Sequence, residues 1–234
     1  MSLQAVLMCG GLGTRLRPWS YIIPKPMFPI GEDPILELLL KRLKLHGITE
    51  IYLSLGYKAE LIETYFKDGS QLGVSLNYVR EPAPLGTAGA LNLLRDKLGD
   101  HFLMMNGDLV TRLDFNRFFN FHVDHNAEIT VGTKAYDVQI PYGVIDDNEG
   151  RVTQLREKPT YSTQINAGIY LIRHSALDLL PPGRFDATQL IQAAMDANRT
   201  VYSYRIEEYW LDMGRIEDYE KANEDVKRWM DEKD

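Results

Sequence analysis

The fold of this chain is decided by the stretch Gln4-Ala5-Val6-Leu7-Met8-Cys9-Gly10-Gly11-Leu12-Gly13-Thr14-Arg15. Residues 4–8 form a short apolar run, which predicts a buried strand, and the run stops just before two consecutive glycines. A glycine-rich loop lets the backbone pass close to phosphate groups, because no side chains intervene and successive N–H groups can bind an anion. Arg15 adds a donor that suits phosphate. The glycines alone fit a tight turn equally well.

Two familiar glycine-rich loops do not match this stretch. A dinucleotide-binding loop requires a third glycine where Leu16 stands and a helix directly after it, which the prolines within 18–26 prevent. A Walker A loop requires lysine and then serine or threonine directly after its last glycine, whereas Thr14-Arg15 follows here. The first lysine is Lys25, and the prolines on either side of it stiffen the backbone and aim its side chain.

Strand and helix patterns alternate through the first half of the chain. Strands are predicted at 51–55, 74–79 and 102–105, and helices at 59–66, at 87–98 and from Pro34 to before Gly47, with Asp33 as the cap of that last helix. This alternation predicts an α/β, Rossmann-like fold with a mostly parallel central sheet flanked by helices. Ligands bind at the carboxyl ends of such strands, so the glycine loop and Asn106-Gly107-Asp108 should share one rim.

The alternation of strands and helices stops after about residue 126. Short strands are predicted at 129–133, 143–145, 152–155 and 169–172, with closing helices at 186–197 and 215–229 and a frayed tail at 231–234. Few helices separate these strands, which predicts a small antiparallel annex that shapes a second pocket. The absence of a repeat or linker predicts one domain over 1–234, divided at about residue 125.

Composition excludes several classes of protein. The formal net charge of -7 argues against general nucleic-acid binding, and no apolar run approaches the roughly 20 residues that a membrane helix needs. The single cysteine, Cys9, excludes an internal disulfide framework and favours a reducing compartment, so we expect a cytoplasmic protein. Cys9 itself is interpreted as a small buried residue rather than a nucleophile.

The glycine loop, read together with later motifs, resembles a known family. Gly10 to Pro18 followed by Pro24-Lys25-Pro26 resembles the signature of the sugar-1-phosphate nucleotidyltransferases, and within them the branch of mannose-1-phosphate guanylyltransferases. Further segments resemble the family's base-contacting, metal-binding and sugar-phosphate segments in the family's order: 84–90, 106–108, 157–159, 166–170 and 210–214. The resemblance covers residues 4 to about 220.

The resemblance implies a reaction and a set of residues. A sugar 1-phosphate oxygen would attack the α-phosphorus of a nucleoside triphosphate, giving a nucleoside diphosphate sugar and pyrophosphate, with the protein supplying positioning and charge neutralisation. The implied catalytic residues are Arg15, Lys25 and Asp108. The implied Mg²⁺ ligands are Asp108 and Asp212. The implied nucleotide-binding residues are Gly10, Gly11, Gly13, Thr14, Glu81, Gly86 and Thr87. The implied sugar-phosphate-binding residues, in the part after residue 125, are Gly143, Glu157, Lys158 and Asn166.

Individual roles follow from the same resemblance. Arg15 would contact the β- and γ-phosphates, Lys25 would reach toward the α-phosphate, and Lys158 would hold the sugar phosphate. Glu157 would accept hydrogen bonds from sugar hydroxyls, and Asn166 would donate to them. Taken singly, these residue types are also common in turns, caps and exposed charged pairs. No nucleic acid or membrane is expected as a partner, and a homo-oligomer stays open.

Glu81 bears on the identity of the base. A carboxylate only accepts hydrogen bonds, and guanine offers two adjacent donors, N1–H and the N2 amino group, whereas uracil and thymine offer one donor flanked by acceptors. Glu81 therefore favours GTP, unless it points to solvent or pairs with Arg80. The alternatives are the same reaction with CTP, UTP or dTTP, and a catalytically silent nucleotide-sugar-binding module. The catalytically silent module is disfavoured because the chain has all five of the charged residues that the reaction would use: Arg15, Lys25, Asp108, Lys158 and Asp212.

Overall fold

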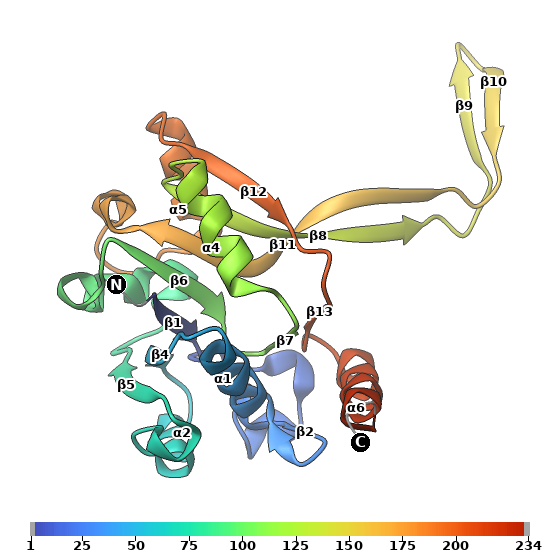
Figure 1. Cartoon of the computed structure of the whole chain (residues 1–234). Coiled ribbons are helices and arrows are strands. Elements are labelled where there is room, and N and C mark those ends of the chain that lie inside the picture. Colours follow the sequence, from blue (N-terminus) through green and yellow to red (C-terminus); the bar gives the residue numbers. More distant parts are fainter. Residues whose placement is uncertain (1–2, 232–234) are drawn as a thin grey trace.

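A seven-stranded sheet forms the centre of the computed structural model, which describes residues 3–231 (Figure 1). Its strands, in spatial order, are β12 (Val201–Arg205), β8 (Ile129–Gln139), β11 (Thr160–Arg173), β6 (His101–Asn106), β1 (Gln4–Met8), β4 (Glu50–Leu55) and β5 (Ser75–Arg80). Only β11 runs antiparallel to its neighbours, β6 and β8, and the other four pairings are parallel. The predicted mostly parallel α/β sheet is confirmed.

Helices cover both faces of the sheet. The α-helices are α1 (Ile35–Leu45), α2 (Ala59–Phe66), α3 (Gly86–Gly89), α4 (Phe115–Asp124), α5 (Ala187–Asp196) and α6 (Ile216–Asp231). Short 3-10 helices occupy Thr14–Leu16, Trp19–Tyr21, Lys25–Met27, Ser70–Leu72, Ala90–Leu93, Arg95–Lys97 and His174–Leu179. Two-residue strands β2 (Pro29–Ile30) and β3 (Asp33–Pro34) pair with each other, as do β7 (Leu109–Thr111) and β13 (Trp210–Asp212), and β9 (Val144–Asn148) and β10 (Arg151–Arg156). Within residues 3–231 no helix is both long and apolar enough to cross a membrane.

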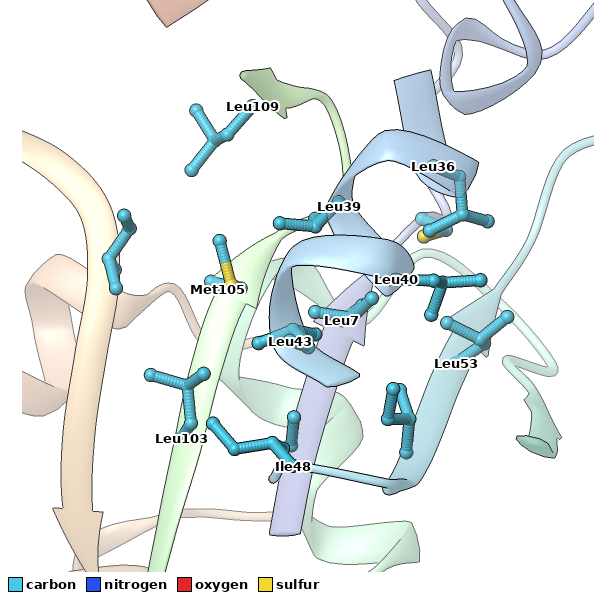
Figure 2. Packing of buried hydrophobic residues seen from close by; sticks show 14 of the residues in the cluster. Leu7, Leu36, Leu39, Leu40, Leu43, Ile48, Leu53, Leu103, Met105 and Leu109 are labelled. Carbon is cyan, nitrogen blue, oxygen red and sulfur yellow. The ribbon is translucent and has the colours of Figure 1, made fainter. Parts of the chain in front are cut away.

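Strand β1 separates two hydrophobic cores because its side chains alternate between the faces of the sheet. Leu7 packs into the core under α1, α2 and α4, whereas Val6 packs into the core under α3 and α5. Helix α1 buries leucines at helical spacing, among them Leu36 and Leu40, against β1, β4 and β6 (Figure 2). Each fully buried leucine contributes about 2 kcal/mol of transfer free energy, so this face fixes α1 against the sheet.

Two helix predictions were wrong in detail. Asp33 does not cap α1: its carboxylate accepts from Lys41 (2.6 Å), Asp33 and Pro34 form β3, and the helix begins at Ile35. The expected helix over 87–98 is split into α3 and two 3-10 turns. A β-carbon on Gly89 would lie 2.5 Å from the carbonyl oxygen of Gly183, so a neighbouring loop packs closely against the point where α3 ends. Gly47 ends α1 in the left-handed conformation, as predicted.

The predicted annex is smaller than expected. Residues 129–133 and 169–172 belong to β8 and β11 of the central sheet, and only β9 and β10 form a separate antiparallel pair. This hairpin stands clear of the rest of the molecule at the end of a ribbon formed by β8 and β11 (Figure 1). Of the tail predicted to fray, Asp231 still belongs to α6 and residues 232–234 lie outside the described residues.

A buried histidine makes the fold sensitive to acid. His122 of α4 is fully buried, its Nε2 lies 3.0 Å from Nδ1 of His101, and its Nδ1 lies 2.8 Å from the hydroxyl of Thr130. Burial, reinforced by His101 and Arg173, lowers the pKa of His122 to about 4. In the unfolded chain this histidine takes up a proton near pH 6.5, so its neutral folded form loses stability as the pH falls from 6.5 toward 4.

We therefore predict that His122→Gln flattens the pH dependence of stability. Between pH 7 and pH 5 the wild-type free energy of unfolding, measured by urea denaturation, should fall by about 2 kcal/mol more than that of the variant. His125→Gln, at the exposed end of the same helix, is the matched control and should keep the wild-type slope. Equal slopes for wild type and His122→Gln would contradict the assignment.

Candidate functional site

The glycine loop leaves β1 and enters a cavity of about 540 Å³ at the carboxyl ends of β1, β5 and β6. Ten of the predicted residues line it: Gly10, Gly11, Gly13, Thr14, Arg15, Lys25, Glu81, Gly86, Thr87 and Asp108. Asp212 lines an adjoining cavity of about 450 Å³, and Arg15 and Gly214 border both cavities. The predicted shared rim is therefore present.

Lys25 sits between two carboxylates at the base of this cavity. Prolines place it at the start of a short 3-10 helix, and only 9 % of the residue is exposed. Its Nζ forms an ion pair with Asp108 and lies 3.4 Å from Oδ1 of Asp212. Asp108 follows β6, and Asp212 ends β13, whose partner strand β7 begins one residue after Asp108. Strand pairing therefore brings the two carboxylates to one cation.

Burial and neighbouring charges together set the electrostatics of this cluster. Burial, followed by the neighbouring charge of Asp108, raises the pKa of Asp212, while Lys25 and Arg15 oppose that rise. Two carboxylates that converge on the Lys25 ammonium present hard oxygen donors of the kind that Mg²⁺ binds. Residues 3–231 contain no group of three or more histidine, cysteine or acidic side chains placed to hold a metal.

Cys9 lines the same cavity, near Asp108 and Glu81. Its side chain is buried, and burial, followed by Asp108 and Glu81, raises the pKa of its thiol far above the ordinary value. A thiol held in this neutral form is a poor nucleophile, in keeping with the interpretation made from the sequence.

Glu81 is fixed against the glycine loop. Its Oε1 accepts from the Ser54 hydroxyl (2.8 Å) and its Oε2 accepts from the Leu85 N–H (2.9 Å). A β-carbon on Gly10 would lie 2.7 Å from Oε1, which explains why a glycine stands there. Arg80 pairs with Glu63 instead. Glu81 is therefore held at the cavity by neutral donors, and the alternative in which it pairs with Arg80 is wrong.

Gly86 and Thr87 close another side of the cavity. Gly86 has a left-handed backbone, and the Thr87 hydroxyl accepts from the Ala187 N–H (2.8 Å) at the start of α5. Thr87 thus lines the cavity and also connects this side of it to the start of α5. Arg184, which lies just before α5, also lines the cavity. The sequence did not single out Arg184, because an isolated arginine in a loop carries no motif.

The comparisons with known proteins agree with this geometry. The model of the family described as nucleotidyl transferase matches residues 4–228. This chain belongs to the nucleotidyl transferase family. It is 36 % identical over 234 residues to the mannose-1-phosphate guanylyltransferase of Mycobacterium tuberculosis, covering 96 % of this chain and 65 % of that one. It is 32 % identical over 241 residues to a UTP--glucose-1-phosphate uridylyltransferase of Synechocystis, covering 94 % and 62 %. The chain spans 62–65 % of the length of the curated relatives it matches.

Solved structures also support the assignment of the fold. HddC of Yersinia pseudotuberculosis superimposes with a TM-score of 0.77 at 29 % identity, over 96 % of this chain and 99 % of that one. A second structure of that protein is a complex with GMP-PN, and it has the same TM-score. The resemblance to the sugar-1-phosphate nucleotidyltransferases, drawn from the motifs, is confirmed at the level of the family.

The residues expected to bind sugar phosphate do not join the cavity. Asn166 lies in β11, and its amide oxygen accepts from the Gly168 N–H (2.9 Å), which tightens a bulge in that strand. Gly143, Glu157 and Lys158 lie together at the base of the β9–β10 hairpin, where all three are exposed. A β-carbon on Gly143 would lie 3.2 Å from Glu157 Oε2. The structure therefore brings together the residues that the resemblance assigns to the nucleotide, and it leaves the four assigned to the sugar phosphate outside both cavities.

Gly107, directly before Asp108, packs closely against the end of β1, and no motif in the sequence indicates this contact. Its N–H donates to the Met8 carbonyl (3.0 Å), and a β-carbon there would lie 2.2 Å from Cys9 Sγ. The contact ties the turn that carries Asp108 to the end of β1. Gly11, in contrast, has no atom within 4 Å of its would-be β-carbon.

We predict that Gly107→Ala lowers the free energy of unfolding by about 1–3 kcal/mol, because the new methyl group displaces Cys9. Gly11→Ala is the control in the same loop system and should change stability by no more than about 0.5 kcal/mol. Urea denaturation of both variants tests this. Equal effects of the two substitutions would show that the packing of Cys9 against Gly107 does not constrain the site.

Proposed function

We propose that this protein transfers a nucleoside monophosphate from a nucleoside triphosphate, preferably GTP, to a sugar 1-phosphate. A phosphate oxygen of the sugar phosphate attacks the α-phosphorus, the bond from that phosphorus to the α,β-bridging oxygen breaks, and pyrophosphate leaves with that oxygen. The observation that carries the proposal is the Lys25 ammonium held between Asp108 and Asp212 beside a glycine-lined cavity. Membership of the nucleotidyl transferase family supports it.

The cavity's cations suit a triphosphate. The glycine loop offers backbone N–H groups, and Arg15 reaches both adjoining cavities, so it would hold the β- and γ-phosphates. Lys25 is buried and positioned by two prolines, so its charge would be in place for the negative charge that develops at the α-phosphate. Asp108 and Asp212 would hold Mg²⁺, which when bound polarises and neutralises phosphate oxygens.

Glu81 supports guanine as the base. Each of its oxygens accepts one hydrogen bond from the protein, which fixes the carboxylate and leaves a second lone pair on each oxygen. Guanine can donate to both oxygens at once through N1–H and the N2 amino group. The guanylyltransferase of M. tuberculosis supports this choice, whereas the uridylyltransferase of Synechocystis supports the alternative with UTP. The single buried cysteine is in keeping with a cytoplasmic reaction.

The reaction is tested with a matrix of GTP, UTP, CTP and dTTP against mannose 1-phosphate and glucose 1-phosphate in Mg²⁺, read by pyrophosphate release. We expect turnover with GTP, and we expect Asp108→Asn to lower kcat by about 100-fold or more. Asp33→Asn removes a carboxylate that pairs with Lys41 on the surface and should keep wild-type turnover. No turnover of the wild type with any pair would support the silent binding module instead.

Base selectivity is tested with Glu81→Gln. Replacing one acceptor oxygen by an amide donor opposes guanine, so kcat/KM for GTP should fall by about 10–100-fold relative to that for UTP. Glu63→Gln, which loses only the surface pair with Arg80, should leave the ratio unchanged. If Glu81→Gln lowers kcat/KM equally for both nucleotides, Glu81 only supports the loop and does not select the base.

A further inference from the structure

The segment 206–212 carries the chain from the edge of the central sheet to Asp212. Strand β12 ends beside Thr133 of β8, and the Ile206 N–H still donates to the Thr133 carbonyl (2.8 Å). The chain then leaves the sheet, and β13 begins at Trp210. Figure 1 shows β13 on the path from the end of β12 to α6. The course of this short segment therefore decides where Asp212 lies.

Strand β13 needs contacts beyond its own pairing. It has three residues and pairs with β7, which also has three, in a sheet of two strands. A two-stranded sheet is marginally stable in water by itself. The Trp210 indole N–H donates to the Ala167 carbonyl (2.8 Å), and the Thr111 hydroxyl donates to the Tyr209 carbonyl (3.0 Å). These contacts fix β13 and its first neighbour, whereas the backbone of residues 206–208, which leads into the strand, is held by a different group.

That group is the side chain of Lys134. Its ammonium donates to three successive carbonyls, those of Ile206 (3.0 Å), Glu207 (3.3 Å) and Glu208 (2.7 Å). A lysine ammonium has three N–H donors, so this segment can use all of them. The three carbonyls converge on one point, which fixes the direction in which the chain enters β13.

Lys134 is a firm point of attachment that borders the site. It lies in β8, which pairs with β11, and its side chain is half-buried. It lines the cavity of about 450 Å³ that Arg15 and Asp212 also line. Burial has the largest effect on the pKa of Asp212, and the charges with the next largest effects are those of Asp108, Lys25 and Arg15. Lys134 therefore acts on Asp212 mainly through the backbone.

We propose that Lys134 is a positioning residue for the cation site: by binding the carbonyls of residues 206–208 it sets the course of β13 and so holds the Asp212 carboxylate beside Asp108. Asp212 Oδ1 lies 3.4 Å from Lys25 Nζ, which is a long contact, so a small displacement of β13 separates this carboxylate from the cluster. The contribution of Lys134 to turnover rests on the proposed function, whereas its positioning of Asp212 is measured without turnover.

The affinity for a divalent cation in Lys134→Met tests the positioning. Methionine keeps an unbranched side chain and removes the ammonium, so three carbonyls lose their donor. Mn²⁺ binding in the presence of a non-hydrolysable GTP analogue, measured by electron paramagnetic resonance, should weaken by about tenfold. The amides of residues 206–213 should also exchange their hydrogens faster, while those of the β8–β11 ladder keep wild-type rates.

Lys221→Met is the matched control. Lys221 lines the same cavity and is exposed, so the substitution removes the same charge without releasing the three carbonyls. Mn²⁺ affinity should stay within about twofold of the wild type. Equal losses in the two variants would show that the charge of the cavity matters and would overturn the positioning role. Wild-type affinity in Lys134→Met, or a wild type that binds no Mn²⁺, would overturn it as well.

A second variant decides the question if Lys134→Met does not fold. Lys134→Arg keeps the charge, but its planar guanidinium presents its donors in a flat fork instead of around one nitrogen. It should weaken Mn²⁺ binding by about threefold in a folded chain. Unchanged Mn²⁺ binding in Lys134→Arg would then overturn the proposal.

Turnover at graded Mg²⁺ concentrations separates a displaced ligand from a collapsed site. At low Mg²⁺, kcat of Lys134→Met should be about tenfold below that of the wild type, and it should recover as Mg²⁺ is raised, with KM for GTP within about threefold of the wild type. A loss of kcat that excess Mg²⁺ does not reverse would overturn the proposal. A wild type that shows no turnover, with the expected Mn²⁺ and exchange results in the variants, would overturn only the proposed function.

Discussion

The position of Lys25 between Asp108 and Asp212 is the constraint on which the rest of the structure depends. Two partly buried carboxylates so close together repel each other, and an uncompensated buried charge costs several kcal/mol. The three residues come from distant parts of the chain, so the loop after β1, the end of β6 and strand β13 must all meet at one point. The Trp210 indole N–H donates to the Ala167 carbonyl (2.8 Å), which anchors β13 to β11 of the central sheet. In the proposed reaction the same cluster would place charge beside the triphosphate.

Local patterns were enough for β1, β4, β5 and β6 and for the helices that pack by one apolar face, but they did not indicate β7, β12 or β13. Helix α2 covers the predicted residues 59–66, and the two-sided core follows from the alternation in β1. Long-range contacts changed the other elements. Asp33 binds Lys41 instead of capping a helix, and the helix expected over 87–98 ends at Gly89, where the Gly183 carbonyl packs closely. Neither contact has a local signal in the sequence.

The meeting of the glycine loop, Glu81 and Asp108 at one cavity was predictable because these residues follow parallel strands, whose carboxyl ends meet at one rim. The role of Asp212 could be predicted only from the family resemblance, since nothing near it in the sequence indicates that β13 pairs with the strand after Asp108. The packing of Gly107 on Cys9 and the position of Arg184 could not be read at all. The β9–β10 hairpin is the largest departure: the resemblance implied that Gly143, Glu157 and Lys158 belong to the site, whereas none of the three lines either cavity.

The account is tested most directly by the affinity of the site for a divalent cation in the presence of a non-hydrolysable GTP analogue. Mn²⁺ can replace Mg²⁺ as a spectroscopic probe, and its binding is measured in wild type, Asp108→Asn and Asp212→Asn. If the two carboxylates hold one cation together with the nucleotide, each substitution should weaken Mn²⁺ binding by roughly tenfold or more. Equal Mn²⁺ affinity in all three proteins would contradict the central claim that Asp108 and Asp212 form a single cation site.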